Sequence, residues 1–421
     1  MTIGFLIIGV GIVAYSLVGK RLSSSFLTAP IVFLGIGFGL AQTGLISPHD
    51  SETFLHPVAE VTLAILLFLD AAQTDLNALR RRHIWPLRML LVGLPLMVVA
   101  GTVVAMMTFP SQPVVLLALL AAILAPTDAA LGQAVVVNKS VPERARRALT
   151  VESGLNDGLA LPLVLFLAAM TIQATDQTGA EWLVFGVKQV VLGPIVGCAV
   201  GLFGGWAIMK AKAGDVTSEV FEGVYALGLV AVTFVAAGLV GGNGFIAAFV
   251  AGLAFGAVVK GRCNFIYEFT EGEGQLLTWL AFLLVGAALV PEAVAHLSFP
   301  MLAYILLSLM VLRPLAIWLS LLGTDASGVS RGFFGWFGPR GLATALFALI
   351  AIEHLPHAQS DFILFTAINA VWISAILHGV TAGPLSNLYA RRIAAKGPCA
   401  ETVLTPNDPT HTKQNRRNTQ L

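Results

Sequence analysis

The sequence contains few charged residues and few cysteines. Asp, Glu, Lys and Arg make up 11% of its 421 residues and 57% are hydrophobic, whereas about 25% of the residues of an average soluble domain are charged. This shortage excludes an ordinary soluble fold, and a net charge of +1 gives no reason to expect nucleic acid as a partner. The three cysteines, Cys198, Cys263 and Cys399, are too scattered for a disulfide framework or a metal site. We therefore expect no cofactor.

Long apolar runs take the place of the missing charge. From Ile3 to Leu388 the chain repeats runs close to the roughly 20 residues that a helix needs to cross a bilayer. They predict an all-α polytopic membrane protein in the lipid bilayer of a cell, with about 13 spans within residues 1–395. The N-terminus lacks the marks of a cleaved signal peptide, so residues 2–19 are expected to be the first span. Residues 396–421 are polar, and we expect a disordered tail.

Basic residues segregate between alternate loops. The loops after the odd-numbered spans hold most of the lysines and arginines, whereas the opposite loops hold acidic residues and one lysine, Lys188. The positive-inside rule places the basic loops and the polar tail in the cytoplasm and the N-terminus outside. The basic residues of this pattern are Lys20, Arg21, Arg80, Arg81, Arg82, Arg88, Lys139, Arg144, Arg146, Arg147, Lys210, Lys212, Lys260, Arg262, Arg331, Arg391, Arg392 and Lys396.

Four ionisable residues lie deep within the apolar runs or close to another ionisable residue in the same run. They are Asp128 in LAPTDAALG, Glu152 and Asp157 in VESGLNDG, and Arg340 in FGPRGLATAL. Burying such a group in a span costs roughly 2.5–3.5 kcal/mol on insertion scales. Each of the four therefore needs a partner or a function.

Other polar residues in the spans have simpler explanations. Asp70 and Arg313 lie toward the cytoplasmic ends of their spans, where contacts at a helix end are sufficient. The histidines, among them His378 near the inner end of the last span, are expected at the surface. The chain has no H-E-x-x-H motif of the kind that binds catalytic zinc, and we do not expect an enzyme.

Two spans carry helix breakers at membrane depth. Pro126 interrupts residues 113–137 beside Asp128, because proline removes a backbone donor and clashes with the preceding turn. The Gly-Pro-Arg-Gly stretch at 338–341 does the same within residues 331–352. Unwound backbone inside a membrane must face protein or a wet cavity. One interrupted span in each half of the chain predicts a transporter built from inverted repeats, with two interrupted crossing helices.

The span after the first break, residues 147–172, carries its polar residues on two adjacent faces. At about 100° per residue, Glu152 and Asn156 share one face, and Ser153 and Asp157 share the next. The oxygen atoms of Ser153 and Asp157 suit a hard monovalent cation. Such a carboxylate holds either a proton or a cation, because burial favours its neutral form and a cation favours its charged form. That competition is the chemistry that a cation/proton exchanger requires.

Glu152 needs a partner of opposite charge if it is to stay ionised in the membrane. Arg340 is a fixed cation deep in a span, and a Glu152–Arg340 ion pair would satisfy both residues. Asn156, one turn from Glu152, is then expected to hydrogen-bond to this pair or to the broken backbone. The alternative that the sequence leaves open is that Arg340 pairs with Asp128 or Asp157, which would neutralise the proposed ion site.

The chain resembles the monovalent cation/proton antiporters, specifically the NhaP-type sodium/proton exchangers, in three segments that occur in the same order: APTDAAL, VESGLNDG and FGPRGLA. The segment LFLDAAQTDLNALRRR, the number of spans and the basic loops are also similar to that family. The resemblance covers essentially residues 1–395. It implies a homodimer in which a core domain moves against a dimerisation domain, and a location in the cell membrane, which in a bacterium is the inner membrane.

The resemblance also implies roles for the matching residues in cation binding. Asp157 would be the main carrier of the cation and the proton, and Ser153 would help to hold the ion. Thr127 and Asp128 would lie in the unwound part of the first crossing helix and complete an alkali-cation site made by Asp157, Asp128 and Ser153.

Two further roles follow from the same resemblance. Glu152 would pair with Arg340 in the second broken helix, and Asn156 would support this pair. An Asn-Asp pair, here Asn156 and Asp157, implies electroneutral exchange of one cation for one proton. The expected activity is exchange of Na⁺ or Li⁺ for H⁺. K⁺/H⁺ exchange is the first alternative, and a sodium-coupled symporter of an organic solute is the second.

Overall fold

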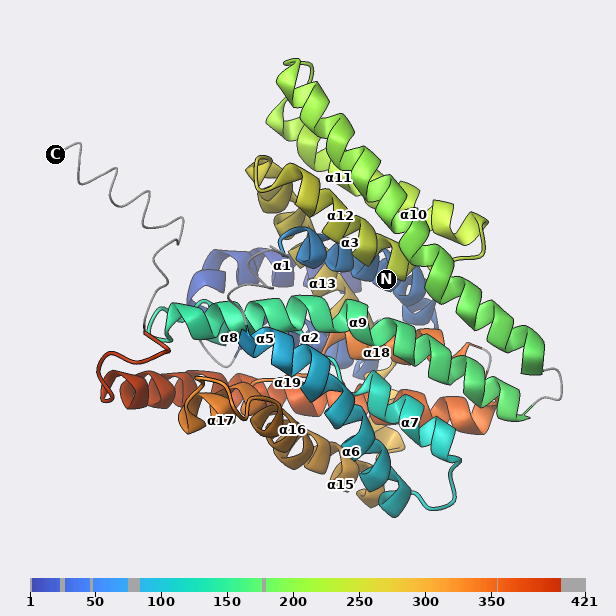
Figure 1. The fold of residues 1–421 in the computed structure, drawn as a ribbon. Helices are drawn as coiled ribbons and strands as arrows, with labels where there is room; N and C mark the ends of the chain where they lie inside the picture. Colours follow the sequence, from blue (N-terminus) through green and yellow to red (C-terminus); the bar gives the residue numbers. More distant parts are fainter. Residues whose placement is uncertain are drawn as a thin grey trace.

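The protein is built from helices (Figure 1). The computed structural model describes residues 2–22, 27–45, 48–74, 84–175, 179–353 and 355–402, and these residues contain no strand. The elements in chain order are α1 (Thr2–Leu22), α2 (Ala29–Gln42), α3 (Pro48–Ala72), α5 (Ile84–Arg88), the π-helix η1 (Met89–Gly93), α6 (Leu94–Thr108), α7 (Val114–Ile123), α8 (Ala129–Val136), α9 (Glu143–Thr175), α10 (Gly179–Ala213), α11 (Glu219–Leu239), α12 (Gly244–Val259), α13 (Asn264–Ala288), α14 (Val290–Ala295), α15 (Phe299–Leu307), the π-helix η2 (Ser308–Leu312), α16 (Arg313–Ser320), α17 (Gly328–Trp336), α18 (Leu342–Ile352) and α19 (His357–Ala394). The predicted all-α class is confirmed.

The apolar helices have the lengths that a bilayer requires. Within the described residues, seven are long and apolar enough to cross a membrane, and they include α9, α10, α11 and α19. Shorter apolar helices accompany them, among them α2, α7, α12 and α18. Helices can span a bilayer because they satisfy their backbone hydrogen bonds internally. The chain is therefore a multi-pass membrane protein, and the number of about 13 spans stays a prediction.

The helices form two bundles (Figure 1). In the first, α10 packs along α12, α12 along α3, and α13 along α2 and α3. We call this group, with α1 and α11, the scaffold bundle. The helices α5–α9 and α14–α19 pack mainly on one another and form the crossing bundle. The two bundles meet where α9 contacts α10, α3 and α12, where α18 contacts α3 and α13, and where α19 contacts α2.

Two helices of the crossing bundle are interrupted where the sequence predicted. Leu124–Asp128 separates α7 from α8 and is called the first break. Phe337–Gly341 separates α17 from α18 and is called the second break. The breaks touch, because the backbone N–H of Asp128 donates to the carbonyl oxygen of Pro339 at 2.8 Å. Unwound backbone at this depth thus finds hydrogen-bond partners in protein, as the membrane requires.

The order of elements repeats within the crossing bundle. A helix with a π-helical turn (α5–η1–α6) precedes the first broken helix and the long α9, and another (α15–η2–α16) precedes the second broken helix and the long α19. Each π-helical turn lies just before a proline at the second position of the next helix, Pro95 and Pro314. Proline lacks the N–H that would bond to the preceding turn, and a π-helical turn accommodates this loss. This shared order supports the predicted repeat more strongly than the two breaks alone.

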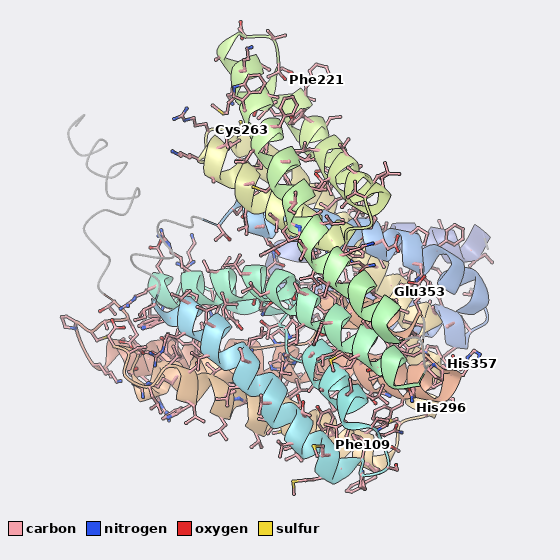
Figure 2. All side chains as sticks on the ribbon, turned by 45° about the vertical axis from the view of Figure 1, so that its right-hand side comes forward. Phe109, Phe221, Cys263, His296, Glu353 and His357 are labelled. Carbon is pink, nitrogen blue, oxygen red and sulfur yellow. The ribbon has the colours of Figure 1, made fainter. Side chains whose placement is uncertain are left out.

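The loops separate toward two ends of the molecule. Figure 2 shows Cys263 near one end, and Phe109, His296 and His357 near the other. Cys263 belongs to a loop predicted to be cytoplasmic, and the other three belong to loops predicted to lie outside. These four residues therefore separate as the predicted alternation of loops requires. Arginines 80–82, which also entered that prediction, lie outside the described residues, and the orientation in the membrane stays a prediction.

The chain beyond α19 returns to the start of α17. Glu401 is 3% exposed and accepts hydrogen bonds from the backbone N–H of Ser327 at 3.1 Å and from the hydroxyl of Ser330 at 2.7 Å. The hydroxyl of Ser330 also lies 3.0 Å from that of Tyr389 on α19. Residues 397–402, which the sequence assigned to the tail, therefore have a defined place on the crossing bundle. Residues 403–421 lie outside the described residues.

Candidate functional site

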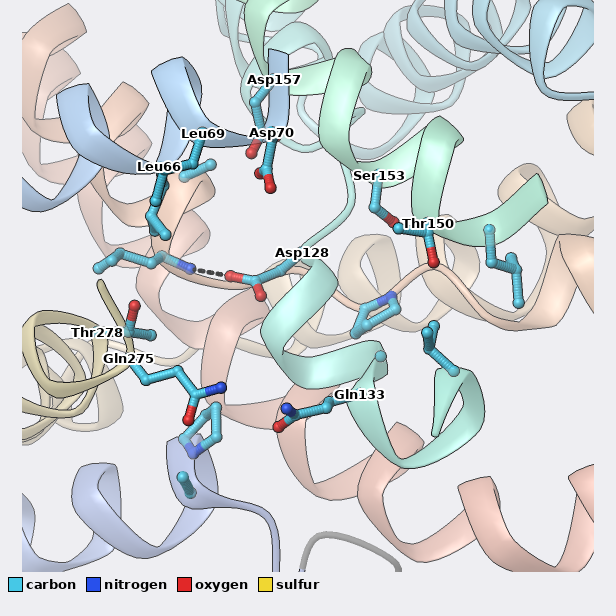
Figure 3. Close-up of a pocket in the computed structure, with 18 of the residues that line it drawn as sticks. Leu66, Leu69, Asp70, Asp128, Gln133, Thr150, Ser153, Asp157, Gln275 and Thr278 are labelled. Atoms are coloured by element: carbon cyan, nitrogen blue, oxygen red, sulfur yellow. Dashed lines mark hydrogen bonds between the residues drawn. The ribbon is translucent and has the colours of Figure 1, made fainter. Parts of the chain in front are cut away.

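A cavity of about 280 Å³ lies between the two bundles (Figure 3). Residues of α2, α3 and α13 line it on the scaffold side, and residues of α8, α9 and the second break line it on the crossing side. Such a volume holds several water molecules or a hydrated cation. Its main polar residues are Asp70, Asp128, Gln133, Ser153, Asp157 and Gln275.

Asp157 on α9 lines this cavity, and one oxygen of its carboxylate has no hydrogen-bond partner among the described residues. That oxygen is Oδ1, which is buried. Ser153, one turn earlier on the same face, also lines the cavity and is 9% exposed. A buried carboxylate oxygen without a donor is costly, and a bound proton or cation removes that cost. The structure thus places these two residues together, as the helical spacing predicted.

Asp128 uses its carboxylate to cap two helices. Oδ1 accepts from the backbone N–H of Leu131 in α8 at 3.1 Å, and Oδ2 accepts from the N–H of Leu342 in α18 at 2.7 Å. Both donors lie in the first turn of a helix, where N–H groups lack intrahelical partners and the helix dipole favours a negative charge. Gly341 permits this approach, because a Cβ atom there would overlap the carboxylate. Asp128 lines the cavity but is already engaged by the backbone.

Thr127 connects the first break to α9. Its hydroxyl accepts from Nδ2 of Asn156 at 2.6 Å, and it lies 3.2 Å from the hydroxyl of Ser153 and 3.3 Å from Oε2 of Glu152. Thr127 is 1% exposed and Asn156 is fully buried. Asn156 therefore reaches the first break through the side chain of Thr127, and not through the broken backbone as expected. Thr127 reaches the cation site only through Ser153, since it does not line the cavity itself.

The predicted ion pair between Glu152 and Arg340 is replaced by a pair between Glu152 and Arg313. Nη2 of Arg313 lies 3.3 Å from Oε1 of Glu152, and each side chain is 4% exposed. The same nitrogen also donates to the carbonyl of Phe337 in the second break at 3.3 Å. Arg313 begins α16 directly after the π-helical turn and before Pro314, so it does not lie at a span end as the sequence suggested. An Arg-Pro pair inside an apolar run was the signal that could have identified it.

Arg340 instead stabilises the end of α7. It is fully buried, and its Nη1 donates to the carbonyl oxygens of Ala125 and Pro126 in the first break. Carbonyl groups after the last turn of a helix lack partners, and the helix dipole there favours a positive charge. Nε and Nη2 of Arg340 have no hydrogen-bond partner among the described residues. The sequence left open that Arg340 pairs with Asp128 or Asp157. The hydrogen bonds of its guanidinium group go to backbone carbonyls instead.

Asp70 on α3 is a site residue that sequence reasoning missed. It was expected to be explained by its position near a helix end, but it lines the cavity together with Asp128 and Asp157 (Figure 3). Gly154 makes room for it, because a Cβ atom at this glycine would lie 3.2 Å from Cβ of Asp70. On the next turn, a Cβ atom at Gly158 would overlap the ring of Phe249 on α12. Two glycines thus let α9 approach the scaffold bundle closely on the side of the cavity.

The site can bind one small cation or a proton in exchange. The oxygen available for such a ligand is Oδ1 of Asp157, which has no hydrogen-bond partner among the described residues. The hydroxyl of Ser153 and the carboxylates of Asp70 and Asp128 line the same cavity. Oxygen atoms are the ligands that hard cations prefer. Clustered carboxylates attract a cation and also favour protonation of one of their number when the cation leaves.

The chain is similar to known proteins in sequence. A family model described as "Sodium/hydrogen exchanger, transmembrane" matches residues 5–388. The K(+)/H(+) antiporter NhaP2 of Shewanella oneidensis is 29% identical over 394 residues, which are 90% of this chain and 65% of that protein. The Na(+)/H(+) antiporter NhaS2 of Synechocystis is 28% identical over 264 residues, 60% of this chain and 47% of that protein. The chain thus spans less than two thirds of the length of these relatives.

The chain is also similar to a solved structure. The sodium proton antiporter MjNhaP1 from Methanocaldococcus jannaschii aligns with a TM-score of 0.72 at 19% sequence identity, over 92% of this chain and 99% of that chain. The likeness shows a shared fold, and it confirms the predicted antiporter fold.

Proposed function

The chain belongs to the sodium/hydrogen exchanger family of transporters, and from this premise we propose that it is a secondary active antiporter that exchanges Na⁺ or Li⁺ for H⁺ across a membrane. The observation that supports this proposal best is the carboxylate of Asp157, which lines the cavity between the bundles and whose buried Oδ1 atom accepts no hydrogen bond from the described residues. A proton or a cation fills this position, and the two exclude each other.

Each residue of the site then has one task. Asp157 binds the cation or the proton, and Ser153 adds a neutral oxygen ligand. Asp128 holds the two breaks together through Leu131 and Leu342 while its charge contributes to the attraction of cations. Asp70 adds negative charge from the scaffold side.

The supporting residues keep the polar side of α9 fixed. Arg313 neutralises Glu152 inside the membrane, so that Glu152 does not compete with Asp157 for the transported ion. Thr127 and Asn156 connect α9 with the first break through the 2.6 Å hydrogen bond between them. Arg340 stabilises the carbonyl end of α7.

Access to the site alternates when the crossing bundle moves against the scaffold bundle. The cavity is lined by Val137, which begins the loop between α8 and α9, and by Thr150 in the first half of α9. Lys139 lies in that loop and Arg144 lies in the first turn of α9. By the positive-inside rule this side is cytoplasmic, so the conformation faces inward. Gly154 and Gly158 provide the close contact along which α9 moves past α3 and α12. We also propose the homodimer that the resemblance implied, with the scaffold bundle as the dimerising part.

Exchange is electroneutral in this proposal. Asn156 is an amide and Asp128 is engaged by two backbone N–H groups. Of the remaining carboxylates in the cavity, we assign the change of charge state to Asp157 and the attraction of cations to Asp70, because Oδ1 of Asp157 accepts no hydrogen bond from the described residues. One cation therefore replaces one proton. The rate of exchange is expected to be insensitive to membrane potential, and a clear dependence on potential contradicts the one-for-one count.

K⁺ is the second candidate cation, because the relative from Shewanella oneidensis is named a K(+)/H(+) antiporter. The oxygen ligands of the site suit either alkali cation. Adding Na⁺, Li⁺ and K⁺ separately distinguishes the two proposals.

The test uses the full chain in proteoliposomes that contain a pH-sensitive dye. Addition of Na⁺ or Li⁺ is expected to move protons in the wild type and in Asp215→Asn, a matched control at an exposed loop residue. Asp157→Asn is expected to abolish exchange. If no cation moves protons in the wild type, antiport is refuted. If Asp157→Asn retains full exchange, the assignment of the site is refuted.

A further inference from the structure

One face of α19 lies against the second break. Ser374, His378 and Thr381 follow one another at intervals of four and three residues, which places them on the same side of the helix. Ser374 and His378 are 0% and 2% exposed. His378 is thus a buried residue and not a surface residue, as its position near the end of the last span had suggested.

Hydrogen bonds connect this face with both ends of the second break. The hydroxyl of Ser374 accepts from the backbone N–H of Arg340 at 2.7 Å. Nδ1 of His378 lies 3.1 Å from that hydroxyl and 2.9 Å from the carbonyl of Ser374, and Nε2 lies 3.0 Å from the carbonyl of Trp336. Trp336 is the last residue of α17, and its carbonyl also accepts from the backbone N–H of Gly338 in the second break at 2.9 Å.

The protonation of the imidazole ring gives these contacts a direction. Among the described residues, Nε2 faces only the carbonyl of Trp336, whereas Nδ1 faces both the carbonyl and the hydroxyl of Ser374. We assign the proton of the neutral ring to Nε2, because Nδ1 has the hydroxyl of Ser374 as a possible donor and Nε2 has an acceptor alone. In the neutral ring Nδ1 then accepts the hydroxyl proton of Ser374. The result is a continuous chain from the N–H of Arg340 through Ser374 and His378 to the carbonyl of Trp336. In such a chain each bond polarises the next, and removal of one member weakens all of them.

This chain spans the part of the backbone that holds the ion site. Between Trp336 and Leu342, the carbonyl of Pro339 accepts from the N–H of Asp128 at 2.8 Å, and the N–H of Leu342 donates to the carboxylate of Asp128 at 2.7 Å. The distance between the two ends of the second break therefore determines where Asp128 lies beside the cavity.

We propose that His378, acting through Ser374, is a positioning residue that sets the geometry of the second break and thereby the cation affinity of the site. His378 does not line the cavity and does not touch the cation. This inference rests on the proposed antiport, because it assigns a distant determinant of affinity to the same site.

The test compares variants of the full chain in proteoliposomes, with the apparent KM for the cation and the maximal rate measured separately. Ser374→Ala and His378→Ala each remove one member of the chain. His378→Gln retains a donor that can reach Trp336. Thr381→Val is the matched control, because the hydroxyl of Thr381 accepts only from the indole Nε1 of Trp336, at 3.0 Å, and touches no backbone of the break.

Each alanine variant is expected to raise the apparent KM about three- to tenfold, the factor that corresponds to one lost hydrogen bond, with a smaller effect on maximal rate. The double variant is expected to be no worse than the worse single variant, because both changes break the same chain. His378→Gln is expected to recover part of the affinity, and Thr381→Val is expected to match the wild type.

Three outcomes overturn the inference while the wild type still exchanges cations for protons. They are an unchanged KM in both alanine variants, additive effects in the double variant, and an equal loss of affinity in Thr381→Val. If His378→Ala does not fold, Ser374→Ala carries the test alone, since it removes a single oxygen atom. Absence of exchange in the wild type refutes the proposed function itself, and this inference with it.

Discussion

Arg313 holds the carboxylate of Glu152 in an ion pair of 3.3 Å, with both side chains almost completely buried. The pair joins α16, which follows a π-helical turn, to the polar stretch of α9. It neutralises one of the carboxylates of that stretch and leaves Asp157, one and a half turns further along, as the carboxylate with an oxygen free for a transported ion. Which of these two acidic residues can bind the transported ion therefore depends on the partners that surround each of them.

Arg313→Met is expected to destabilise the protein by about 3–5 kcal/mol, because it leaves the charge of Glu152 buried without a partner. The double variant Arg313→Met/Glu152→Gln is expected to recover most of that loss. Unfolding of the detergent-solubilised protein measures both. The control is Arg147→Met, which disrupts an exposed pair with Glu143 and is expected to cost about 1 kcal/mol or less. Equal losses for Arg313→Met and the control contradict the assigned pair.

Asp70→Asn is expected to raise the apparent KM for the cation about three- to tenfold and to leave the maximal rate largely intact. The carboxylate of Asp70 adds negative charge to the cavity without being the residue that exchanges its proton, and one charge at a few ångströms contributes on the order of 1–4 kcal/mol at most. Titration of exchange rate against cation concentration provides the measurement. Complete loss of exchange, as expected for Asp157→Asn, means that Asp70 is itself the carrier.

Gly158→Ala is expected to slow exchange and to destabilise the protein by about 1–3 kcal/mol, because the added methyl group overlaps the ring of Phe249. A second substitution, Phe249→Leu, is expected to relieve the overlap and restore part of the exchange rate. Gly228→Ala on α11 is the matched control, since a Cβ atom there meets no neighbour within 4 Å. If Gly158→Ala exchanges as fast as the control, α9 does not depend on this close approach to the scaffold bundle.

The docking of Glu401 is expected to be independent of pH in the neutral range. Burial alone raises the pKa of Glu401, but hydrogen bonds from Ser327 and Ser330 outweigh it and lower the pKa from 4.5 to about 2. A carboxyl with a lowered pKa stabilises the folded state above its ordinary pKa, and this contribution disappears as the pH falls toward about 2. Between about pH 5 and 9 the contact should therefore stay constant.

A spin label on Cys399 reports this docking, in a Cys198→Ser background that removes the exposed cysteine. Its mobility is expected to be low and constant over the neutral range in the parent protein. Glu401→Gln is expected to make the label mobile throughout that range. A change in mobility near neutral pH in the parent protein shows that another group controls the contact.

The two breaks and the polar residues of α9 could be predicted from the sequence because their cause is local. Pro126 and Pro339 cannot continue a helix, whatever surrounds them. A carboxylate such as Asp157 in an apolar run is costly in any arrangement of helices, so its presence alone indicates a function. The spacing of Ser153 and Asp157 on one face follows from the pitch of a helix.

The partners of the arginines could not be predicted in the same way. Arg313 and Arg340 are both cations in apolar runs of the second half of the chain, and the sequence contains no distance between helices. The π-helical turn before Arg313 and the crossing of the two breaks decide that Arg313 reaches Glu152 and that Arg340 reaches the carbonyl groups of α7. The place of Asp70 in the site could not be predicted for the same reason, because it depends on how closely α9 approaches α3.

The sequence by itself therefore determined that this is a helical membrane protein with two broken helices and a carboxylate at membrane depth, since the cost of proline in a helix and of charge in lipid depends on chemistry alone. The tertiary structure decided which charges pair, that Asp128 caps two helices, and that His378 is buried against the second break. Those outcomes depend on the packing of helices far apart in the chain, where a shift of a few ångströms exchanges one partner for another.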